Sequence, residues 1–422
     1  MNLLLTGGTV FLDGRFENLD VAVSDGRIVS VSPSFPKEGF SVIELHNRCL
    51  VPGFVDVHVH LREPGFSYKE TIASGTAAAA AGGYTAVCAM PNLKPVPDCP
   101  ENLQPQLEAI EKTARVRVYP YGAVTRGEQG GALSDMAGLA PRVVGFSDDG
   151  RGVQSEAMMR GAMELARKLD RPIVAHCEDE SLLTKGWCVH DGAFAHARGL
   201  PGNDPASEWR QVERDIRLVR ETGCRYHVCH ISTKESVALV RAAKAEGLPV
   251  TCETGPHYLL LCDEDLLDEG RFRMNPPIRS AADRDALVEG LLDGTVDCVA
   301  TDHAPHSAEE KGRGLEKSAM GVVGLETAFP AVYTHLVKPG VLSMDRLVEL
   351  LNGNAAKRFG YGTPLAEGQP ADLTAFDLDR PFTVDPEKFQ SMGRATPFAG
   401  MELYGVCKMT MVDGEIVWRE DE

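Results

Sequence analysis

The chain has 422 residues, of which 43% are hydrophobic and 25% are charged, and its formal net charge is −18. This composition is typical of a globular protein with a buried core, and it argues against intrinsic disorder. Because the chain is acidic and has no dense run of Lys or Arg, it lacks the basic surface expected of a nucleic-acid-binding protein. A small anionic substrate remains compatible with this charge, since one arginine can hold a carboxylate.

The cysteines and the first residues bear on the cellular compartment. The 11 cysteines are scattered, without a Cys-x-x-Cys pair, and several lie in apolar runs, among them Cys88 and Cys298. We therefore expect buried, reduced thiols and a cytoplasmic protein. The first residues have neither the basic start nor the apolar stretch of a signal peptide, and no run approaches the roughly 20 apolar residues that span a membrane.

The two ends of the chain have the same pattern of short strands and tight turns. Residues 1–50 read as short strands separated by Gly and Asp-Gly turns, and this pattern returns from about Ala371 to the C-terminus. The phrases SDGRIVSV and VDGEIVW even resemble each other. We expect one small β-sandwich domain built from residues 1–50 and 361–422, with residues 51–360 forming a separate body.

In residues 51–360, short apolar runs alternate with helical patterns. Repeated strand–helix alternation implies parallel strands, and about eight repeats favour a (β/α)₈ barrel of the TIM type. The alternative is an open doubly wound sheet, which normally carries a glycine-rich turn after its first strand, whereas the first run here ends in HVHLREPG. Ser232, with Glu235 three residues later, is expected to cap the helix after the sixth run. The runs are FVDVHVH, YTAVCAM, VRVYPYGAV, RVVGFS, PIVAHC, RYHVCHI, LPVTCET and DCVATDH.

Residues that commonly ligate metals fall at the ends of these runs. Because a barrel gathers the carboxyl ends of its strands at one mouth, these side chains should converge there. Taken singly, each histidine is more often a hydrogen-bonded core residue, and an aspartate is more often a cap or turn former. The residues are His58 and His60 after the first run, Asp148 and Asp149 after the fourth, His176 after the fifth, His230 after the sixth and Asp302 after the eighth.

Three further residues near the runs have other expected orientations. His227 lies three residues before His230 and should face the opposite way, which favours a structural role. His303 should point away from the mouth, whereas His306 could reach it.

Imidazole and carboxylate ligands without a thiolate suit Zn²⁺, Mn²⁺, Co²⁺ or Fe²⁺. Four histidines and two aspartates exceed the needs of one tetrahedral ion, but two ions that share a carboxylate would use them all. Such a pair can activate water and polarise an amide carbonyl, and amide hydrolysis requires both effects.

Several motifs together resemble the amidohydrolase superfamily, and in particular the bacterial dihydroorotases of the long-chain type. The motifs are PGFVDVHVHLREPG, GFSDDGRGVQ, VCHIST, MNPPIR, VATDHAPH and GVVGLETAFP, and the resemblance covers nearly the whole chain. It implies a reversible cyclisation of N-carbamoyl-L-aspartate to (S)-dihydroorotate plus water, in the de novo biosynthesis of UMP.

The resemblance also implies a role for each ligand. His58 and His60 would bind one Zn²⁺, and His176 and His230 would bind a second, although a single ion is not excluded. Many relatives bridge the ions with a carboxylated lysine, but RVVGFSDDG contains no lysine and resembles a subgroup that uses an aspartate instead. Asp149 is the expected bridge, with Asp148 as the alternative.

Asp302 would complete the first metal site and act as the catalytic acid and base. In the ring-opening direction, metal-activated hydroxide would attack the ring amide and Asp302 would pass the proton to the leaving nitrogen.

The same resemblance implies a set of substrate contacts. Arg62 follows His60 by two residues, and a guanidinium can bind the carboxylate of dihydroorotate through two hydrogen bonds, although a surface ion pair is the ordinary alternative. Asn residues beside proline are likewise common turn formers. By resemblance, the substrate would contact His60, Arg62, Asn92, Asn275, His306, and the backbone of Met320 and Gly321.

Two other functions compete with this interpretation. A hydantoinase, dihydropyrimidinase or allantoinase would share the fold and the HxH motif, but those enzymes generally have the bridging lysine and bind substrates without this carboxylate. A non-catalytic barrel that scaffolds aspartate carbamoyltransferase would be expected to lose metal ligands, and here each position is filled. As partners we expect the small-molecule substrate, a second copy in a homodimer, and possible association with aspartate carbamoyltransferase.

Overall fold

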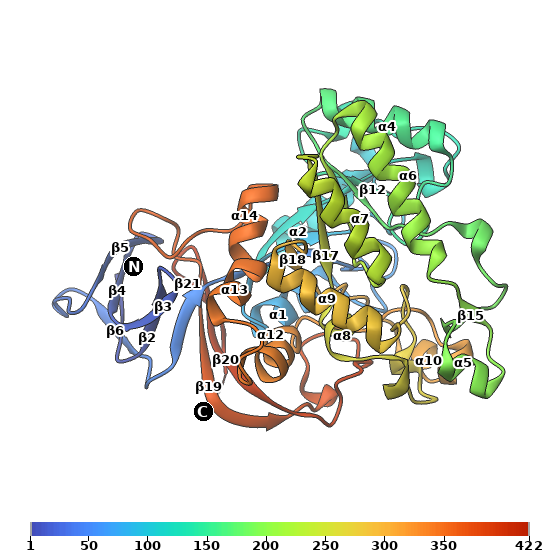
Figure 1. Ribbon diagram of the computed structural model, residues 1–422. Coiled ribbons are helices and arrows are strands. Elements are labelled where there is room, and N and C mark those ends of the chain that lie inside the picture. Colours follow the sequence, from blue (N-terminus) through green and yellow to red (C-terminus); the bar gives the residue numbers. More distant parts are fainter. Residues whose placement is uncertain (1, 421–422) are drawn as a thin grey trace.

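The computed structural model describes residues 2–420, and both ends of the chain lie in a β domain beside a larger barrel (Figure 1). One sheet has the order β5-β4-β1-β6, and the other has the order β21-β20-β19-β7-β2-β3. The strands of the first sheet are β1 (Leu3–Thr6), β4 (Asp20–Ser24), β5 (Arg27–Ser32) and β6 (Ser41–Glu44). Those of the second are β2 (Thr9–Leu12), β3 (Arg15–Asn18), β7 (Cys49–Pro52), β19 (Leu373–Thr383), β20 (Glu402–Val412) and β21 (Glu415–Arg419).

The two sheets of the β domain share an apolar core drawn from both ends of the chain. Leu5 and Val21 from one sheet pack with Leu50, Leu373 and Met411 from the other. Leu5, Val21 and Leu50 lie more than 300 positions before Leu373 and Met411 in the sequence, so neither end could bury this face alone.

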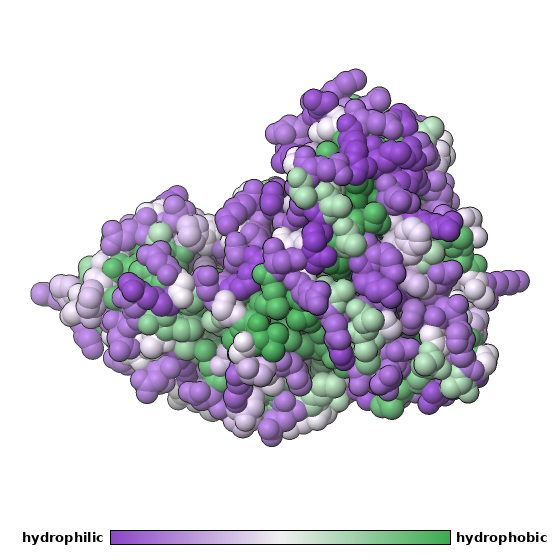
Figure 2. Space-filling view, in the orientation of Figure 1, coloured by the Kyte–Doolittle hydropathy of each residue, from purple (hydrophilic) through white to green (hydrophobic). Residues whose placement is uncertain are grey.

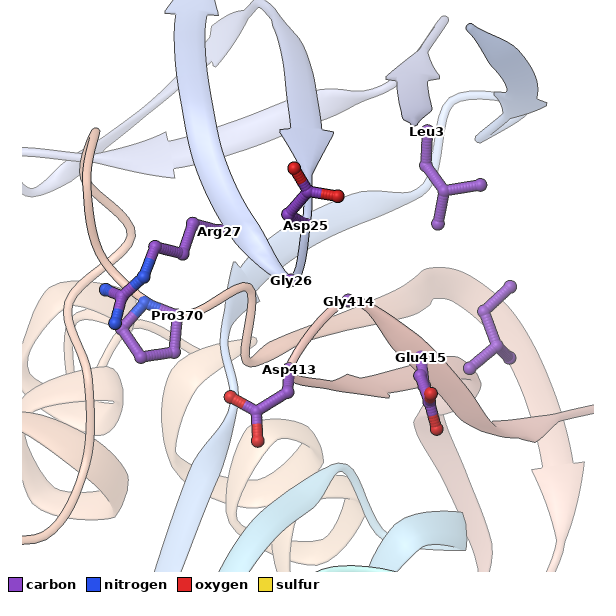
Figure 3. Close-up of a pocket in the computed structure, with 9 residues that line it drawn as sticks. Leu3, Asp25, Gly26, Arg27, Pro370, Asp413, Gly414 and Glu415 are labelled. Atoms are coloured by element: carbon purple, nitrogen blue, oxygen red, sulfur yellow. The ribbon is translucent and has the colours of Figure 1, made fainter. Parts of the chain in front are cut away.

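Two Asp-Gly turns meet at the edge of this core, and Figure 3 shows the pocket of about 690 Å³ between them. Asp25 and Gly26 have φ values of 50° and 77°, and Asp413 and Gly414 have 48° and 77°, as expected for tight turns between antiparallel strands. A Cβ at Gly26 would lie 2.7 Å from the carbonyl oxygen of Asp413, so only glycine fits this contact. None of the residues that line this pocket is a candidate site residue.

The barrel strands lie in sequence order and are all parallel, which confirms the predicted fold class. Each of the eight apolar runs contains a strand, with β10 and β11 as two pieces of the third. A parallel bridge between Val59 and His303 closes the ring by joining the first strand to the segment after the last. The strands are β8 (Phe54–Val59), β9 (Tyr84–Ala89), β10 (Arg117–Pro120), β11 (Gly122–Ala123), β12 (Phe146–Ser147), β13 (Ile173–Ala175), β16 (Tyr226–Val228), β17 (Val250–Thr254) and β18 (Cys298–Val299).

Helices cover the outside of the barrel and leave its interior to side chains from the strands. Val57, Cys88, Tyr121, Val174 and Cys229 fill that interior as one buried cluster. The longer covering helices are α1 (Ile72–Ala81), α2 (Pro100–Thr113), α4 (Glu156–Lys168), α6 (Ala206–Thr222), α7 (Lys234–Ala245) and α9 (Ala281–Asp293). Shorter helices include α12 (Ala328–Val332), α13 (Met344–Val348) and α14 (Asn354–Phe359) near the β domain.

The start of α7 corrects one expectation. Thr233, and not Ser232, is the N-cap, and its hydroxyl accepts a hydrogen bond from the backbone N–H of Ser236. Ser232 instead donates its hydroxyl to the buried carboxylate of Glu208. The sequence spacing could not reveal this partner because Glu208 comes from the preceding helix.

Figure 2 shows a mainly hydrophilic face, with a hydrophobic area over α12 and α13. None of the helices within residues 2–420 is long and apolar enough to cross a membrane. All 11 cysteines are free, and nine of them are buried.

Candidate active site at the barrel mouth

The structure brings together the residues predicted from the ends of five strands. They surround a cavity of about 180 Å³ at the carboxyl end of the barrel, whose lining includes His60, Asp149, His176 and Asp302. The side chains of His58 and His230 lie directly beside this group and are almost fully buried.

Two imidazoles and two carboxylates form the first half of the cluster. The Nε2 atom of His58 lies 3.5 Å from Asp149 Oδ1 and 3.5 Å from Asp302 Oδ1. The Nε2 atom of His60 lies 3.1 Å from Asp302 Oδ1 and 3.4 Å from Asp149 Oδ2. These are the spacings of atoms that could share one cation.

The second half lies on the other side of the Asp149 carboxylate. His230 Nε2 is 3.4 Å from Asp149 Oδ1, and His176 Nδ1 is 3.7 Å from the same oxygen. The two imidazole nitrogens are 3.1 Å apart. Asp149 is therefore the carboxylate between the two pairs of histidines.

Asp148 has a different environment from its neighbour. One of its oxygens accepts hydrogen bonds from the backbone N–H groups of Val124 and Thr125, at 2.8 and 3.0 Å, and the other accepts the hydroxyl of Thr125. These bonds turn Asp148 toward the third strand and leave Asp149 to face the histidines, since consecutive side chains on extended backbone point to opposite sides.

The residues present fit a metal pair. Asp149 Oδ1 and His58 Nε2 are buried polar atoms without a hydrogen-bond partner in the described chain, although each faces groups that could share a ligand. The atoms of His58, His60 and Asp149, and those of Asp149, His176 and His230, each lie within 4.8 Å of one another. Buried polar atoms are normally paired, so the unpaired ones point to a ligand between them.

The electrostatics of the cluster agree with this fit. Burial raises the pKa of Asp149, but the charges and hydrogen bonds of the surrounding histidines, led by His58, outweigh it and hold the pKa well below its usual range. Burial lowers the pKa of His58, but the carboxylates of Asp149 and Glu253 outweigh it and raise the pKa well above its usual range. The site therefore favours ionised carboxylates with positive charge between them, which divalent ions would supply.

Glu253, which the sequence analysis did not single out, holds His58 in place. Its fully buried carboxylate lies 2.7 Å from His58 Nδ1 and 3.0 Å from His227 Nε2. A hydrogen bond from Nδ1–H to Glu253 leaves His58 Nε2 free to ligate a metal. The one signal in the sequence was an acidic residue inside the apolar run LPVTCET, where a carboxylate is costly to bury without a partner.

His227 faces away from the histidine cluster and contacts Glu253 and Thr251, in keeping with a structural role. His303 likewise points away, with Nε2 3.4 Å from the buried carboxylate of Glu70.

Three residues at this mouth have a strained backbone conformation. Arg62, His230 and Asp302 have φ values of 60°, 31° and 46°, in the left-handed region that residues other than glycine rarely adopt. Such strain persists only where the surrounding contacts hold it, and it is common at functional sites.

The predicted substrate contacts form most of the remaining wall. Arg62, Asn92, Asn275, Met320 and Gly321 all line the cavity. Asn92 donates its amide to the carbonyl of Asp149, and Asn275 lies 3.3 Å from a Glu178 oxygen.

Glu178 was missed in the sequence, although it lies two residues after His176 in the motif HCEDE. It is buried, and its carboxylate is 3.8 Å from His176 Nε2.

His306 lies beside the cavity and not among the residues that line it. Its Nε2 is 3.5 Å from the Arg62 guanidinium and 2.8 Å from the carbonyl oxygen of Met320, and its Nδ1 is 3.1 Å from Lys69 Nζ. Burial, followed by the charges of Arg62 and Lys69, lowers the pKa of His306 to about 3. A neutral His306 can thus donate from Nε2 to Met320 and accept from Lys69.

Comparison with known proteins relates this chain to the dihydroorotases. A family model described as dihydro-orotase-like matches residues 47–236. The chain is 49% identical to a dihydroorotase of Geobacillus sp. (strain WCH70) and 46% identical to one of Bacillus cereus (strain ATCC 14579), over 100% of this chain and 99% of each relative.

Among solved structures, an L-hydantoinase (dihydropyrimidinase) from Arthrobacter aurescens has a TM-score of 0.88 at 27% identity, covering 100% of this chain and 97% of that one. A dihydropyrimidinase from Brevibacillus agri NCHU1002 has a TM-score of 0.87 at 21% identity, covering 99% and 95%, and shows the shared fold.

Proposed function

This chain belongs to the dihydroorotase family, and we propose that it interconverts N-carbamoyl-L-aspartate and (S)-dihydroorotate with a pair of Zn²⁺ ions at the barrel mouth. It is a metal-dependent cyclic amide hydrolase, a dihydroorotase, and we propose that it acts in pyrimidine synthesis. The observation that carries the proposal is the convergence of four histidines and two aspartates on a cavity that also contains Arg62.

The donor set supports a specific division of ligands. His58, His60 and Asp302 would hold one ion, His176 and His230 would hold the other, and Asp149 would bridge them. When bound, such ions lower the pKa of water toward neutrality and polarise an amide carbonyl.

Asp302 is positioned to move the proton. Its carboxylate lines the cavity and lies within 3.1 Å of His60 Nε2. Burial raises its pKa, but the hydrogen bond of His60 and the charges of His58 and its neighbours lower it below its usual range. Asp302 is therefore ionised at neutral pH, so it can accept a proton from the attacking water and deliver it to the ring nitrogen as the amide opens.

Arg62 is the group that would recognise the substrate carboxylate. Its Nε donates to the carbonyl of Pro305, and its Nη2 faces the neutral ring of His306. The carboxylates of Asp302 and Asp149 attract the guanidinium, but Arg62 forms no ion pair with a carboxylate in the described chain, so its charge is available to an anionic ligand. Asn92, Asn275, and the backbone of Met320 and Gly321 would complete the contacts to the ring.

The fold neighbours make hydantoin the appropriate competing substrate. We expect purified enzyme to contain about two zinc ions per chain by elemental analysis and to turn over dihydroorotate far faster than hydantoin. Turnover of hydantoin without turnover of dihydroorotate would contradict the substrate assignment.

We also propose a cytoplasmic homodimer with possible association with aspartate carbamoyltransferase. The free thiols support a reducing compartment. Size-exclusion chromatography with light scattering, with and without that transferase, tests both associations.

A further inference from the structure

Within the described residues, the side chain of the buried Lys311 bonds only to carbonyl groups. Lys311 is the last residue of the short helix α10 (Ala308–Lys311) and is 9% exposed. Its Nζ donates to the carbonyl oxygens of Arg273, Ala319 and Gly321 at 3.0, 2.8 and 2.7 Å. An ammonium group has three N–H donors, so these three acceptors satisfy it fully.

Burying this cation is unfavourable by itself. Burial, followed by the charge of Arg273, lowers the pKa of Lys311 to about 7, and no acidic group offsets that effect. The three carbonyl acceptors favour the protonated form, since only an ammonium has three N–H donors to satisfy them.

The three carbonyls belong to two loops that form one wall of the active site. Arg273 lies two residues before Asn275, which lines the cavity, and Gly321 lines it directly. The backbone N–H of Gly321 also donates to the Arg273 carbonyl at 3.1 Å, so the two loops meet at the atom that Lys311 binds. Ser318 donates its hydroxyl to the carbonyl of Lys311 itself, which holds the lysine backbone in the same hydrogen-bond network.

We propose that Lys311 is a positioning residue that ties these two loops together and thereby sets the shape of the substrate-binding wall. The inference rests on the proposed function, because it assigns the wall to binding of the dihydroorotate ring. None of the candidate metal ligands bonds to Lys311, so we expect zinc binding to be retained without it. Loss of the tie should consequently weaken substrate binding more than metal binding or the chemical step.

Lys311→Met removes the ammonium and keeps an unbranched side chain that is one atom shorter. We expect kcat/KM for dihydroorotate to fall by about 10- to 100-fold, mainly through KM, because small displacements of positioning groups have effects of this size. Zinc content should equal that of the wild type, and hydrogen exchange should accelerate in peptides that cover residues 319–321. Lys317→Met is the matched control, since Lys317 is an exposed lysine of the same segment.

Lys311→Arg keeps the charge, but its planar group cannot present three N–H donors from one nitrogen. It should raise KM by less than Lys311→Met does, and it decides the question if Lys311→Met does not fold. Wild-type KM in the variant that folds would overturn the proposal, as would a loss of activity explained entirely by lost zinc. Wild-type enzyme that cannot turn over dihydroorotate would instead contradict the proposed function.

Discussion

Replacing Glu253 with glutamine should weaken metal binding without contacting the metal. The carboxylate is fully buried and lies 2.7 Å from His58 Nδ1, 3.0 Å from His227 Nε2 and 3.4 Å from the backbone N–H of His230. Burial raises its pKa, but His58 and His227 outweigh that effect and lower the pKa to about 2, so it is ionised. Glutamine has the same shape but no charge, and it cannot accept a hydrogen bond through both of its terminal atoms.

The size of the effect follows from the partners that remain. The amide oxygen of the introduced glutamine could still accept a hydrogen bond from His58 Nδ1. The amide N–H could donate to His227 Nε2 if His227 changed tautomer, because the Thr251 hydroxyl can donate to or accept from His227 Nδ1. The fold should therefore survive, and the main loss is the negative charge that makes His58 a better ligand. Loss of such an outer partner typically lowers metal affinity about 10- to 100-fold, or about 1.4 to 2.8 kcal/mol.

Competition with a zinc-binding chelator measures this affinity directly. The Glu253→Gln enzyme should lose zinc at lower chelator concentration and regain activity when zinc is added. Glu316→Gln is the control, because Glu316 is exposed. Wild-type zinc affinity in Glu253→Gln would refute the role assigned to this carboxylate.

Three further predictions concern other residues of the barrel. Asp302→Ala should lower kcat by about 10²- to 10⁴-fold, and a folded, zinc-loaded variant with full turnover would exclude Asp302 as the proton-transferring group. Arg62→Met should raise KM for dihydroorotate by about 10- to 150-fold, the loss of a charged hydrogen bond, and an unchanged KM would place the substrate carboxylate elsewhere. Asp56 is fully buried, and burial raises its pKa from 3.8 to about 7. Between these two pKa values the folded protein keeps a proton that the unfolded chain releases. The stabilisation from this group is therefore complete below about pH 4 and is lost as the pH rises to about 7. The free energy of unfolding should fall by no more than about 1.4 kcal/mol per pH unit. With saturating zinc, denaturant unfolding of Asp56→Asn should depend less on pH than that of the wild type, and parallel profiles would contradict the assignment.

The barrel and the meeting of its ligands were predictable because both follow from one geometric rule. Parallel strands in sequence order place His58, Asp149 and Asp302 at one rim, however far apart they lie in the chain. The repeated strand–turn–strand patterns at both ends likewise indicated strands, and these pair in the sheet β21-β20-β19-β7-β2-β3.

Details that depend on partners from other elements were not predictable in the same way. Alternation along a strand implies that only one of Asp148 and Asp149 faces the mouth, but the contact of Asp148 with Thr125 belongs to tertiary structure. Glu253 and Lys311 escaped notice because nothing in their local sequence identifies His58 or the Gly321 carbonyl as their partners. The contact of His306 with Arg62 also belongs to tertiary structure, so the sequence could not show that His306 lies beside the cavity and not in its lining.

Crystallography of zinc-loaded protein, with anomalous data at the zinc edge, tests the central claim most directly. Two peaks are expected, one beside His58, His60 and Asp302 and the other beside His176 and His230, with the Asp149 carboxylate between them. No peak in this cluster, or zinc bound away from Asp149, would contradict the account.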